Sequence, residues 1–477
     1  MNAASEDGAA TPRPNALRAV AAGTGWAVDL LGFRPLRGVV RWPGFPRAIQ
    51  WLMLAAFVAL ILLAWGQGTP AGVNDKLFAR SNLVTLIVWG LWWPAMVWLA
   101  FWFGRAWCMV CPLELVGDLG ERTARAIGWR QGEVPRWMAG GSLILALFVA
   151  LQLLVPGVHL HRVPAYTAWM LAGLLALALG AGLVYRHRAF CRGVCPVGLL
   201  LGTYGRGGML AVRPAPAVAA GRAPGPDARA CPSLLNPSRL ESSADCLLCT
   251  HCFKESAPGA MRLELRRPYS PTDFRPLLAP WPVTGFVMVA SGFVVSELCS
   301  EWAAAKNVFL AVPQWVTAQL GWPAGAGWVE GVWTVFVVPA VLWLVLALAW
   351  WLAGERGSWS DLWRRLALPV AIVVAAGHMS KGLAKFVSWL PFLPGAWRDP
   401  AGLETARAIT AKTLRSPPSL VGLGLVGWIS LGLVILALLV ATREHVLTRR
   451  GAPGAMRVVW PLGTLAAGLL AILAGWR

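Results

Sequence analysis

Charged side chains are scarce in this chain of 477 residues, where Asp, Glu, Lys and Arg together make up only 13%. Soluble globular proteins carry about 25% of such residues. Hydrophobic residues instead reach 57%, and the mean hydropathy is +0.59. The composition therefore excludes an ordinary soluble protein and predicts an all-α polytopic membrane protein.

Long apolar runs indicate where the chain would cross a bilayer, since a spanning helix needs about 20 apolar residues. Residues 1–15 are polar and do not resemble a cleaved signal peptide, so we expect the first run to be a permanent anchor. We expect about nine spans, of which the seventh is the shortest: 49–66, 83–103, 138–155, 165–185, 282–298, 329–352, 366–378, 420–441 and 458–473.

Acidic residues are the scarcer charged type, 22 against 42 Lys and Arg, which gives a net charge of +20. The basic residues lie before the first span and after the second, fourth, sixth and eighth. Because Lys and Arg accumulate in cytoplasmic loops, this pattern predicts a bacterial inner-membrane protein with a cytoplasmic N-terminus, rather than a nucleic-acid-binding protein. The loop 382–418, expected outside, is also basic, so a re-entrant seventh run would invert everything after it.

Four regions follow from this pattern. We expect a basic cytoplasmic segment at 1–48, two duplicated two-helix units at 49–205, a cytoplasmic linker and cysteine-rich loop at 206–280, and further transmembrane helices at 281–477.

The duplication is visible in two stretches, "GRAWCMVCPLELVGDLGER" from Gly104 and "HRAFCRGVCPVGLLLGTYGR" from His187. Each follows two spans and contains a Cys-Pro pair, and the repeat is about 84 residues long. Both copies are expected at the cytoplasmic face, where their thiols can converge. A Pro after each pair suits the first turn of a helix, whose N-terminus favours an anionic neighbour. The four converging cysteines are Cys108, Cys111, Cys191 and Cys195.

A second group of cysteines lies between the fourth and fifth spans, after the Pro/Ala/Gly-rich stretch 213–230, which we expect to be a flexible linker. The run Cys246-x2-Cys249-x2-Cys252 has the spacing of three corners of a cubane iron–sulfur cluster. Ser256 stands where bacterial ferredoxins carry a further Cys, so Cys231 is the candidate for the fourth ligand. Zinc is the rival metal for these thiols, although three cysteines at two-residue intervals favour iron–sulfur. Eight cysteines thus divide into two groups of four, and Cys299 is left as an apolar filler.

With these motifs the chain resembles the membrane-bound polyferredoxins of the NapH, NosR and CcoG type, over roughly residues 41–268. The resemblance implies two 4Fe-4S clusters and electron transfer at the cytoplasmic face. The chain departs from it because Cys108-x2-Cys111 is one residue shorter than the usual spacing and because only one three-cysteine run is present. A flavin-bearing domain ahead of the first span is not expected either.

Ionisable residues in the C-terminal spans are further candidates, because such groups are costly in lipid and often mark working sites. Glu297 lies near the end of the fifth span, and His378, Lys381 and Lys385 share one helix face. His378, with Lys381 and Glu297, is the candidate proton acceptor of a quinol site. The alternative is an interfacial basic face with snorkelling lysines.

The chain has only six histidines, and His159 and His161 lie in a short outer loop. We therefore do not expect a haem held by two histidines across the bundle. A copper ion at His159 and His161 would have only two ligands, so we expect these to be ordinary loop residues, as we do for His251.

Three functions are compatible with the sequence. The first is a membrane electron carrier that links quinol or a soluble reductase to a respiratory acceptor through unidentified redox partner proteins. The second is a metal reductase, for copper, or an assembly factor for a respiratory metalloenzyme. The third is a zinc-stabilised membrane scaffold or transporter.

Overall fold

The computed structural model describes residues 26–269, 273, 278–449, 452 and 454–477. Among these residues, eight helical segments are long and apolar enough to cross a membrane, which agrees with the predicted all-α membrane protein. Residues 1–25 of the expected N-terminal segment, with the signal-peptide prediction, lie outside the described residues. The eight segments are Arg47–Ala64 (α2), Leu83–Phe103 (α4, η2 and α5), Pro164–Val184 (α10), Trp281–Cys299 (α15), Pro323–Leu352 (η7, α17, η8 and α18), Trp359–Arg398 (α19, η9 and α20), Leu423–Thr448 (α22) and Ala455–Ala474 (η10 and α23).

The third expected span, 138–155, is the exception in length. It forms α9, Ser142–Gly157, an apolar helix of 16 residues that is shorter than the other eight. Gly141 before it lies against Pro282 at the beginning of α15, and Gly157 at its end lies against Trp328 of α17 (Ala326–Val332). Although α9 is short, it therefore extends from the beginning of α15 to α17.

The seventh expected span, 366–378, is much longer than predicted. It belongs to α19, Trp359–Trp389, a helix of 31 residues in which Pro369 is accommodated inside the helix. Polar residues interrupt the hydropathy signal, because Ser380, Lys381 and Lys385 lie within the same helix. Lys385 is thus part of α19 and not of an outer loop. The helix packs against α5, α15 and α22, and it is the most buried of the candidate spans.

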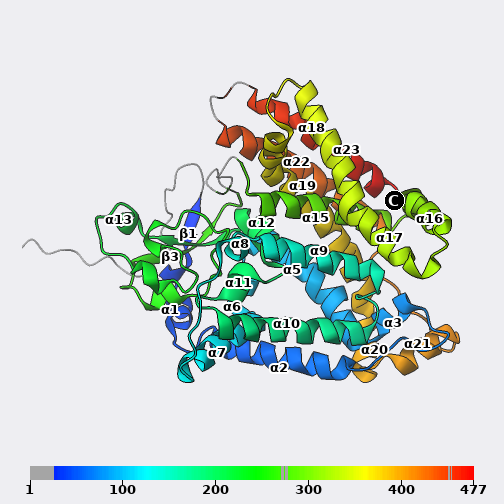
Figure 1. The fold of residues 1–477 in the computed structure, drawn as a ribbon, viewed down its shortest axis with the longest axis horizontal. Coiled ribbons are helices and arrows are strands. Elements are labelled where there is room, and N and C mark those ends of the chain that lie inside the picture. The colour runs from blue at the N-terminus through cyan, green and yellow to red at the C-terminus, as the bar shows by residue number, and fades with distance from the viewer. Residues whose placement is uncertain (1–25, 270–272, 274–277, 450–451, 453) are drawn as a thin grey trace, which may run out of the picture.

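Short helices gather at the two ends of the helix layer (Figure 1). At one end lie α6 (Ala106–Val110), α7 (Pro112–Ala126), α11 (Ala189–Gly193) and α12 (Gly198–Tyr204), together with the strands; we call this end the cysteine face. At the other end lie α3 (Asp75–Ser81), α16 (Ala303–Gln319), α20 (Leu393–Arg398) and α21 (Leu403–Thr410), which we call the opposite face. Helix α16, with most of its side chains exposed or half-buried, was not expected from the sequence.

A three-stranded antiparallel sheet in the order β1-β3-β2 covers the cysteine face. It consists of β1 (Ala27–Asp29), β2 (Leu210–Pro214) and β3 (Met261–Arg266), so the segment before the first span pairs directly with the cysteine-rich region. Arg41, in α1 (Arg34–Arg41), adds a hydrogen bond from Nη2 to the Ser256 carbonyl at 2.9 Å. The division at residue 48 is therefore not a structural boundary.

The Pro/Ala/Gly-rich stretch expected as a flexible linker contains regular structure. The end of β2 is followed by one turn of helix, α13 (Pro216–Ala219), and by the 3-10 turn η4 (Ala228–Ala230), which leads into Cys231. Asp227 caps this turn by accepting from the Arg229 N–H at 2.7 Å. A local hydrogen bond of this kind fixes the approach of the chain to Cys231.

Candidate functional site

The two Cys-Pro stretches fold alike and bring their thiols together at the cysteine face. Cys108 lies in α6 and Cys191 in α11, helices of five residues each, while Cys111 precedes α7 and Cys195 precedes α12. Burial raises the pKa of Cys111, and negative charge on Cys108 and Cys195 raises it further. Burial likewise raises the pKa of Cys191, with contributions from Glu114 and from the three other thiols. The four thiols of the first set thus lie near enough to influence one another's charge, and their role as ligands of one cluster stays a prediction.

Backbone N–H groups face two of these sulfurs in the same way in both copies. The N–H groups of Leu113 and Glu114 donate to Cys111, and those of Val197 and Gly198 donate to Cys195. In each copy the donors are the second and third residues after the cysteine, as expected at a helix N-terminus. They oppose the effect of burial, which with the charge on Cys108 raises the pKa of Cys195 to about 12.

The role of the proline differs between the copies. Pro112 occupies the first turn of α7, as the sequence predicted. Helix α12 begins only at Gly198, so Pro196 lies before that helix and the prediction was wrong for the second copy. A tight turn after Cys195 presents the N–H groups instead, because the Gly198 N–H also donates to the Cys195 carbonyl at 2.9 Å.

The second set, Cys231, Cys246, Cys249 and Cys252, also converges. Burial raises the pKa of Cys246 to about 12, opposed by the N–H of Leu248 and assisted by charge on Cys249 and Cys231. Burial raises the pKa of Cys252, and charge on Cys246, Cys249 and Cys231 raises it further. Cys231, fifteen residues upstream, therefore lies near Cys246 and Cys252, and its role as the fourth ligand stays a prediction. Cys299 is buried at the end of α15, within the apolar bundle.

Two arginines at matching positions of the repeat lie between the two cysteine sets. Arg105, three residues before Cys108, is hydrogen-bonded to that thiol and donates from Nη1 to the Ala244 carbonyl at 3.0 Å. Arg188, three residues before Cys191, interacts with Cys249 of the second set and with Cys191 of the first. Burial alone would lower the pKa of both guanidinium groups, but the neighbouring negative charges raise it. Arg188 is thus a largely buried cation shared by the two sets, whereas Arg105 is a buried cation next to the first set and the chain before Cys246.

Arg188 is held by a carboxylate from the other copy of the repeat. Its Nη2 lies 2.8 Å from Glu114 Oε1, and the side chains are 14% and 6% exposed. Gln50 of α2 donates to the other carboxylate oxygen of Glu114 and to the Met109 carbonyl. The backbone at Arg188 is left-handed, with φ at 54°, which turns this side chain back toward the cluster of thiols.

Across the described residues, no three His, Cys, Asp or Glu side chains lie close enough together to hold one metal ion. A tetrahedral zinc site requires its thiolates within about 4 Å of one another, given a zinc–sulfur distance of about 2.3 Å. The thiolates of a cubane cluster are farther apart because each binds a different iron. A zinc ion therefore requires the four thiolates of a set to lie closer together than a 4Fe-4S cluster does.

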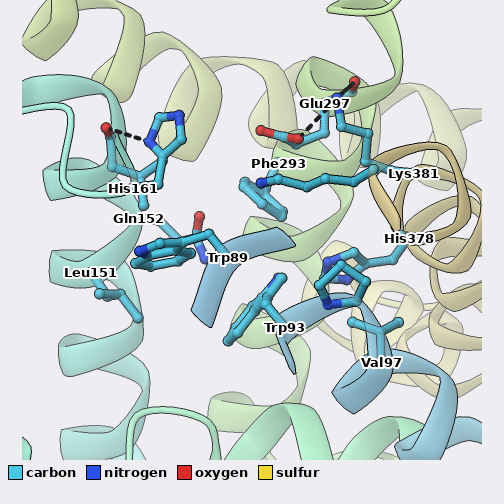
Figure 2. A pocket seen from close by; sticks show the side chains of 14 residues that line it. Trp89, Trp93, Val97, Leu151, Gln152, His161, Phe293, Glu297, His378 and Lys381 are labelled. Atoms are coloured by element: carbon cyan, nitrogen blue, oxygen red, sulfur yellow. Dashed lines mark hydrogen bonds and ion pairs between the residues drawn. The ribbon is translucent and has the colours of Figure 1, made fainter. Parts of the chain in front are cut away.

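A second candidate site is a small, mainly apolar cavity with a few polar and charged groups inside the bundle, between α5, α9, α15 and α19 (Figure 2). It includes the three residues predicted for a quinol site, Glu297, His378 and Lys381. Its volume of about 30 Å³ is enough for one or two water molecules. Nδ1 of His378 and Oε1 of Gln152 are buried there without a hydrogen-bond partner among the described residues. Water suits such a cavity, and a quinol ring would require its walls to move apart.

Lys381 forms ion pairs with two carboxylates beside this cavity. Its Nζ lies 3.2 Å from Glu297 Oε2 and 2.6 Å from Glu301 Oε1, and it donates to Ser300 Oγ at 2.8 Å. Figure 2 shows Lys381 reaching from α19 toward Glu297 on α15. Since Glu301 follows the end of α15, the ion cluster leads from the cavity toward the opposite face. The expected snorkelling alternative does not describe Lys381, which is 8% exposed.

Aromatic rings connect this cavity with both Cys-Pro stretches. Trp107, next to Cys108, has its ring centroid 5.4 Å from that of Trp92; Trp92 lies 6.3 Å from Trp93, and Trp93 lies 6.2 Å from His378. From the second stretch, Tyr204 at the end of α12 lies 6.0 Å from His378. These separations are within the range of aromatic contacts. His378 is therefore the point where contacts from the two copies meet.

Several residues of the cavity were missed by sequence reasoning. His161 lines it and contacts Trp89 at 6.3 Å, although it was expected to be an ordinary loop residue. Trp89 lies in η2 (Leu86–Trp92), a π-helical segment, and such segments often occur at functional sites. Gln152 on α9 was the one available signal, because a lone amide in an apolar span is costly unless it has a partner.

Comparison of the chain with family models, with curated proteins and with solved structures gave no match.

Proposed function

We propose that the protein is an electron carrier of the bacterial inner membrane, with two 4Fe-4S clusters held at the cysteine face. The observation that carries this proposal is the gathering of eight half-buried cysteines into two groups of four, with an arginine from each repeat beside them. Each cluster would supply one-electron transfer. The first would be held by Cys108, Cys111, Cys191 and Cys195, and the second by Cys231, Cys246, Cys249 and Cys252.

The surroundings of the cysteines suit a negatively charged cluster. Backbone N–H groups already face Cys111, Cys195 and Cys246, and hydrogen bonds to sulfur are among the features that set cluster potentials. Arg105 adds positive charge next to the first set, and Arg188 adds it next to both sets. A buried charge is costly unless it is paired with an opposite charge. The two arginines therefore favour an anionic group beside each of them.

The cavity at His378 is the place where we propose that electrons enter from quinol. Two aromatic contacts reach His378 from the two cysteine stretches, and Lys381 with Glu297 leads toward the opposite face. His378 would accept a proton as quinol is oxidised, after the cavity walls open. The clusters and the N-terminus would then face the cytoplasm, as the distribution of basic residues predicts.

Copper reduction or assembly of a metalloenzyme, and a zinc-stabilised scaffold, remain predictions from the sequence. They differ from the electron-carrier proposal in measurable ways: the first requires a copper-dependent phenotype, and the second requires a colourless protein that contains zinc and no sulfide.

Single serine variants test the proposal and the division of the ligands together. EPR spectra of the reduced protein should lose the same signal in Cys111→Ser and Cys195→Ser and a different signal in Cys246→Ser. Cys299→Ser is the matched control, because this cysteine lies in the bundle, and it should keep both signals. Loss of different signals in Cys111→Ser and Cys195→Ser would contradict the division, and the absence of any cluster signal from the wild type would contradict the function.

A further inference from the structure

A separate cavity of about 260 Å³ opens between α19 and α22 at the cysteine face, away from both cysteine sets. Its position is fixed by two contacts: Arg267 after β3 pairs with Glu444 of α22 at 3.1 Å, and Arg364 of α19 donates to the Ala279 carbonyl before α15 at 2.9 Å. The cavity is close in size to the lower end of the range for small-molecule sites, about 300–1,000 Å³. We refer to it as the arginine cavity.

Two guanidinium groups on its wall share a single carboxylate. Arg365 of α19 and Arg449 at the end of α22 each place Nη1 3.1 Å from Glu355 Oε1. Glu355 is 5% exposed, so it fixes both arginines from below the surface. Two cations and one anion leave one net positive charge among these three groups. A fixed pair of guanidinium groups matches the geometry of a phosphate group.

A buried imidazole faces the same space. His445 lines the cavity and is 6% exposed, and its Nε2 has no hydrogen-bond partner among the described residues. Trp350 contacts the ring edge-on, with the centroids 5.9 Å apart, so the imidazole cannot readily turn away. A buried polar atom without a partner is costly, and an oxygen of a bound ligand would satisfy it in the tautomer that protonates Nε2.

Apart from Thr448, the remaining walls of the cavity are apolar. Leu278, Leu368 and Pro369 line the cavity beside the charged groups. Next to it, Trp281 at the start of α15 is 48% exposed, and Arg364 lies over its ring at 5.9 Å. Exposed tryptophans mark the headgroup level of membrane proteins. A ligand with a charged head and an apolar body fits this combination.

We propose that the arginine cavity binds a phosphoryl group, supplied by the headgroup of an anionic phospholipid. Arg365 and Arg449 bind the phosphoryl oxygens, His445 donates to one of them, and the apolar wall contacts the start of the acyl chains. Basic pockets between helices at a membrane surface recognise lipid headgroups through this chemistry. Free phosphate has the same phosphoryl chemistry, and the two sources are separated by experiment.

The test uses the full-length protein, purified and delipidated in detergent, with the shift in the unfolding temperature measured as a function of added ligand. The probes are dihexanoyl phosphatidylglycerol, inorganic phosphate and, as the phosphate-free control, dihexanoylglycerol. We expect phosphatidylglycerol to stabilise the wild type. Arg365→Gln and Arg449→Gln should each weaken binding by about tenfold or more, the size expected for one charge-assisted hydrogen bond.

Two further variants separate binding from folding. Arg356→Gln is the matched control, because Arg356 adjoins Glu355 but lies over the Trp351 ring at 4.8 Å, outside the cavity lining, and it should bind as the wild type does. Leu368→Trp fills the cavity but keeps both arginines. It should therefore abolish binding of phosphatidylglycerol although the charges of the cavity are unchanged.

Stabilisation by phosphatidylglycerol alone supports a lipid, and equal stabilisation by inorganic phosphate supports a phosphate site that does not need acyl chains. The proposal is overturned if neither probe stabilises the wild type, if dihexanoylglycerol stabilises it equally, or if Arg449→Gln and Leu368→Trp bind phosphatidylglycerol as the wild type does.

Discussion

The ion pair between Arg188 and Glu114 gives the sharpest test of how the two repeats hold each other at the cysteine face. Its 2.8 Å separation and its burial mean that neither charge is well solvated. At an effective dielectric constant of about 20, two unit charges at this distance attract by about 6 kcal/mol before the cost of desolvation is counted. Breaking a buried pair by removing one partner costs about 3–5 kcal/mol, because the other charge is left uncompensated.

We therefore expect Arg188→Gln to lower the free energy of unfolding by about 3 kcal/mol. The Arg188→Gln/Glu114→Gln double variant should recover part of this loss, because it leaves no buried charge at the pair and two amides can still hydrogen-bond. The interaction energy from the double-mutant cycle should then be about 2 kcal/mol. The assay is reversible unfolding in mixed micelles, followed by tryptophan fluorescence.

Arg192→Gln is the matched control for this cycle, since Arg192 lies on α11, which Arg188 precedes, and its side chain donates to the His187 carbonyl at 3.4 Å. It should change the free energy of unfolding by no more than about 0.5 kcal/mol. If the effects of Arg188→Gln and Glu114→Gln are additive, or if Arg188→Gln is as mild as Arg192→Gln, the pair does not couple the two repeats and the reasoning is refuted.

Three further changes probe the interior cavity and its link to the cysteines. Lys381→Met leaves Glu297 and Glu301 without their shared cation and should lower the free energy of unfolding by about 2 kcal/mol, as measured by thermal unfolding. The loss is smaller than for a fully buried pair because the two carboxylates are partly exposed. His378→Gln should leave the iron content unchanged and slow quinol-driven reduction by about tenfold or more, as measured by stopped-flow absorbance. Trp92→Leu interrupts the ring contacts at Trp92 and should slow the same reduction severalfold with unchanged iron content.

Each of these changes has a control of the same residue type elsewhere in the chain. Lys412→Met alters an exposed cation near the opposite face, Trp315→Leu alters an exposed ring on α16, and His251→Gln alters an exposed imidazole between two cysteines. All three should behave as the wild type. Equal effects in test and control, or loss of iron in His378→Gln or Trp92→Leu, would contradict the assigned roles.

The sequence predicted the helical membrane architecture and the cysteine motifs because both depend on local patterns. Apolar runs and short cysteine spacings are read from neighbouring residues, and the repeat of Arg105 at Arg188 is visible by alignment. The function of these arginines is not, because their contacts with Ala244 and Cys249 join residues more than sixty positions apart. Pairing over such distances has no local signal.

For helix α19 the prediction was wrong for a different reason: polar residues within the helix made the predicted span too short. Lys381 and Lys385 lower the hydropathy of the second half, so the run stopped at His378, whereas the helix continues to Trp389. Burial by surrounding helices, with Glu297 as the partner of Lys381, makes these charges acceptable inside the bundle. His161 was misjudged for a related reason, since it lines the same cavity as His378 only when α9 packs beside α15.

The sheet could not be predicted from local sequence patterns either. Strand β1 has three residues and β3 six, and the registers Ala27 to Arg266 and Leu210 to Leu265 join three separate parts of the chain. Such short strands have little pattern of their own. Their pairing is determined by the apolar cluster beneath the sheet, to which Val212, Phe253 and Met261 contribute.

The measurement that tests the central claim most directly is the iron, acid-labile sulfide and zinc content of anaerobically purified protein, with an EPR spectrum after dithionite reduction. Two 4Fe-4S clusters predict about eight iron and about eight sulfide per chain, with signals from reduced clusters. Zinc without sulfide, in a colourless protein, would contradict the electron-carrier proposal and would favour a zinc-stabilised scaffold.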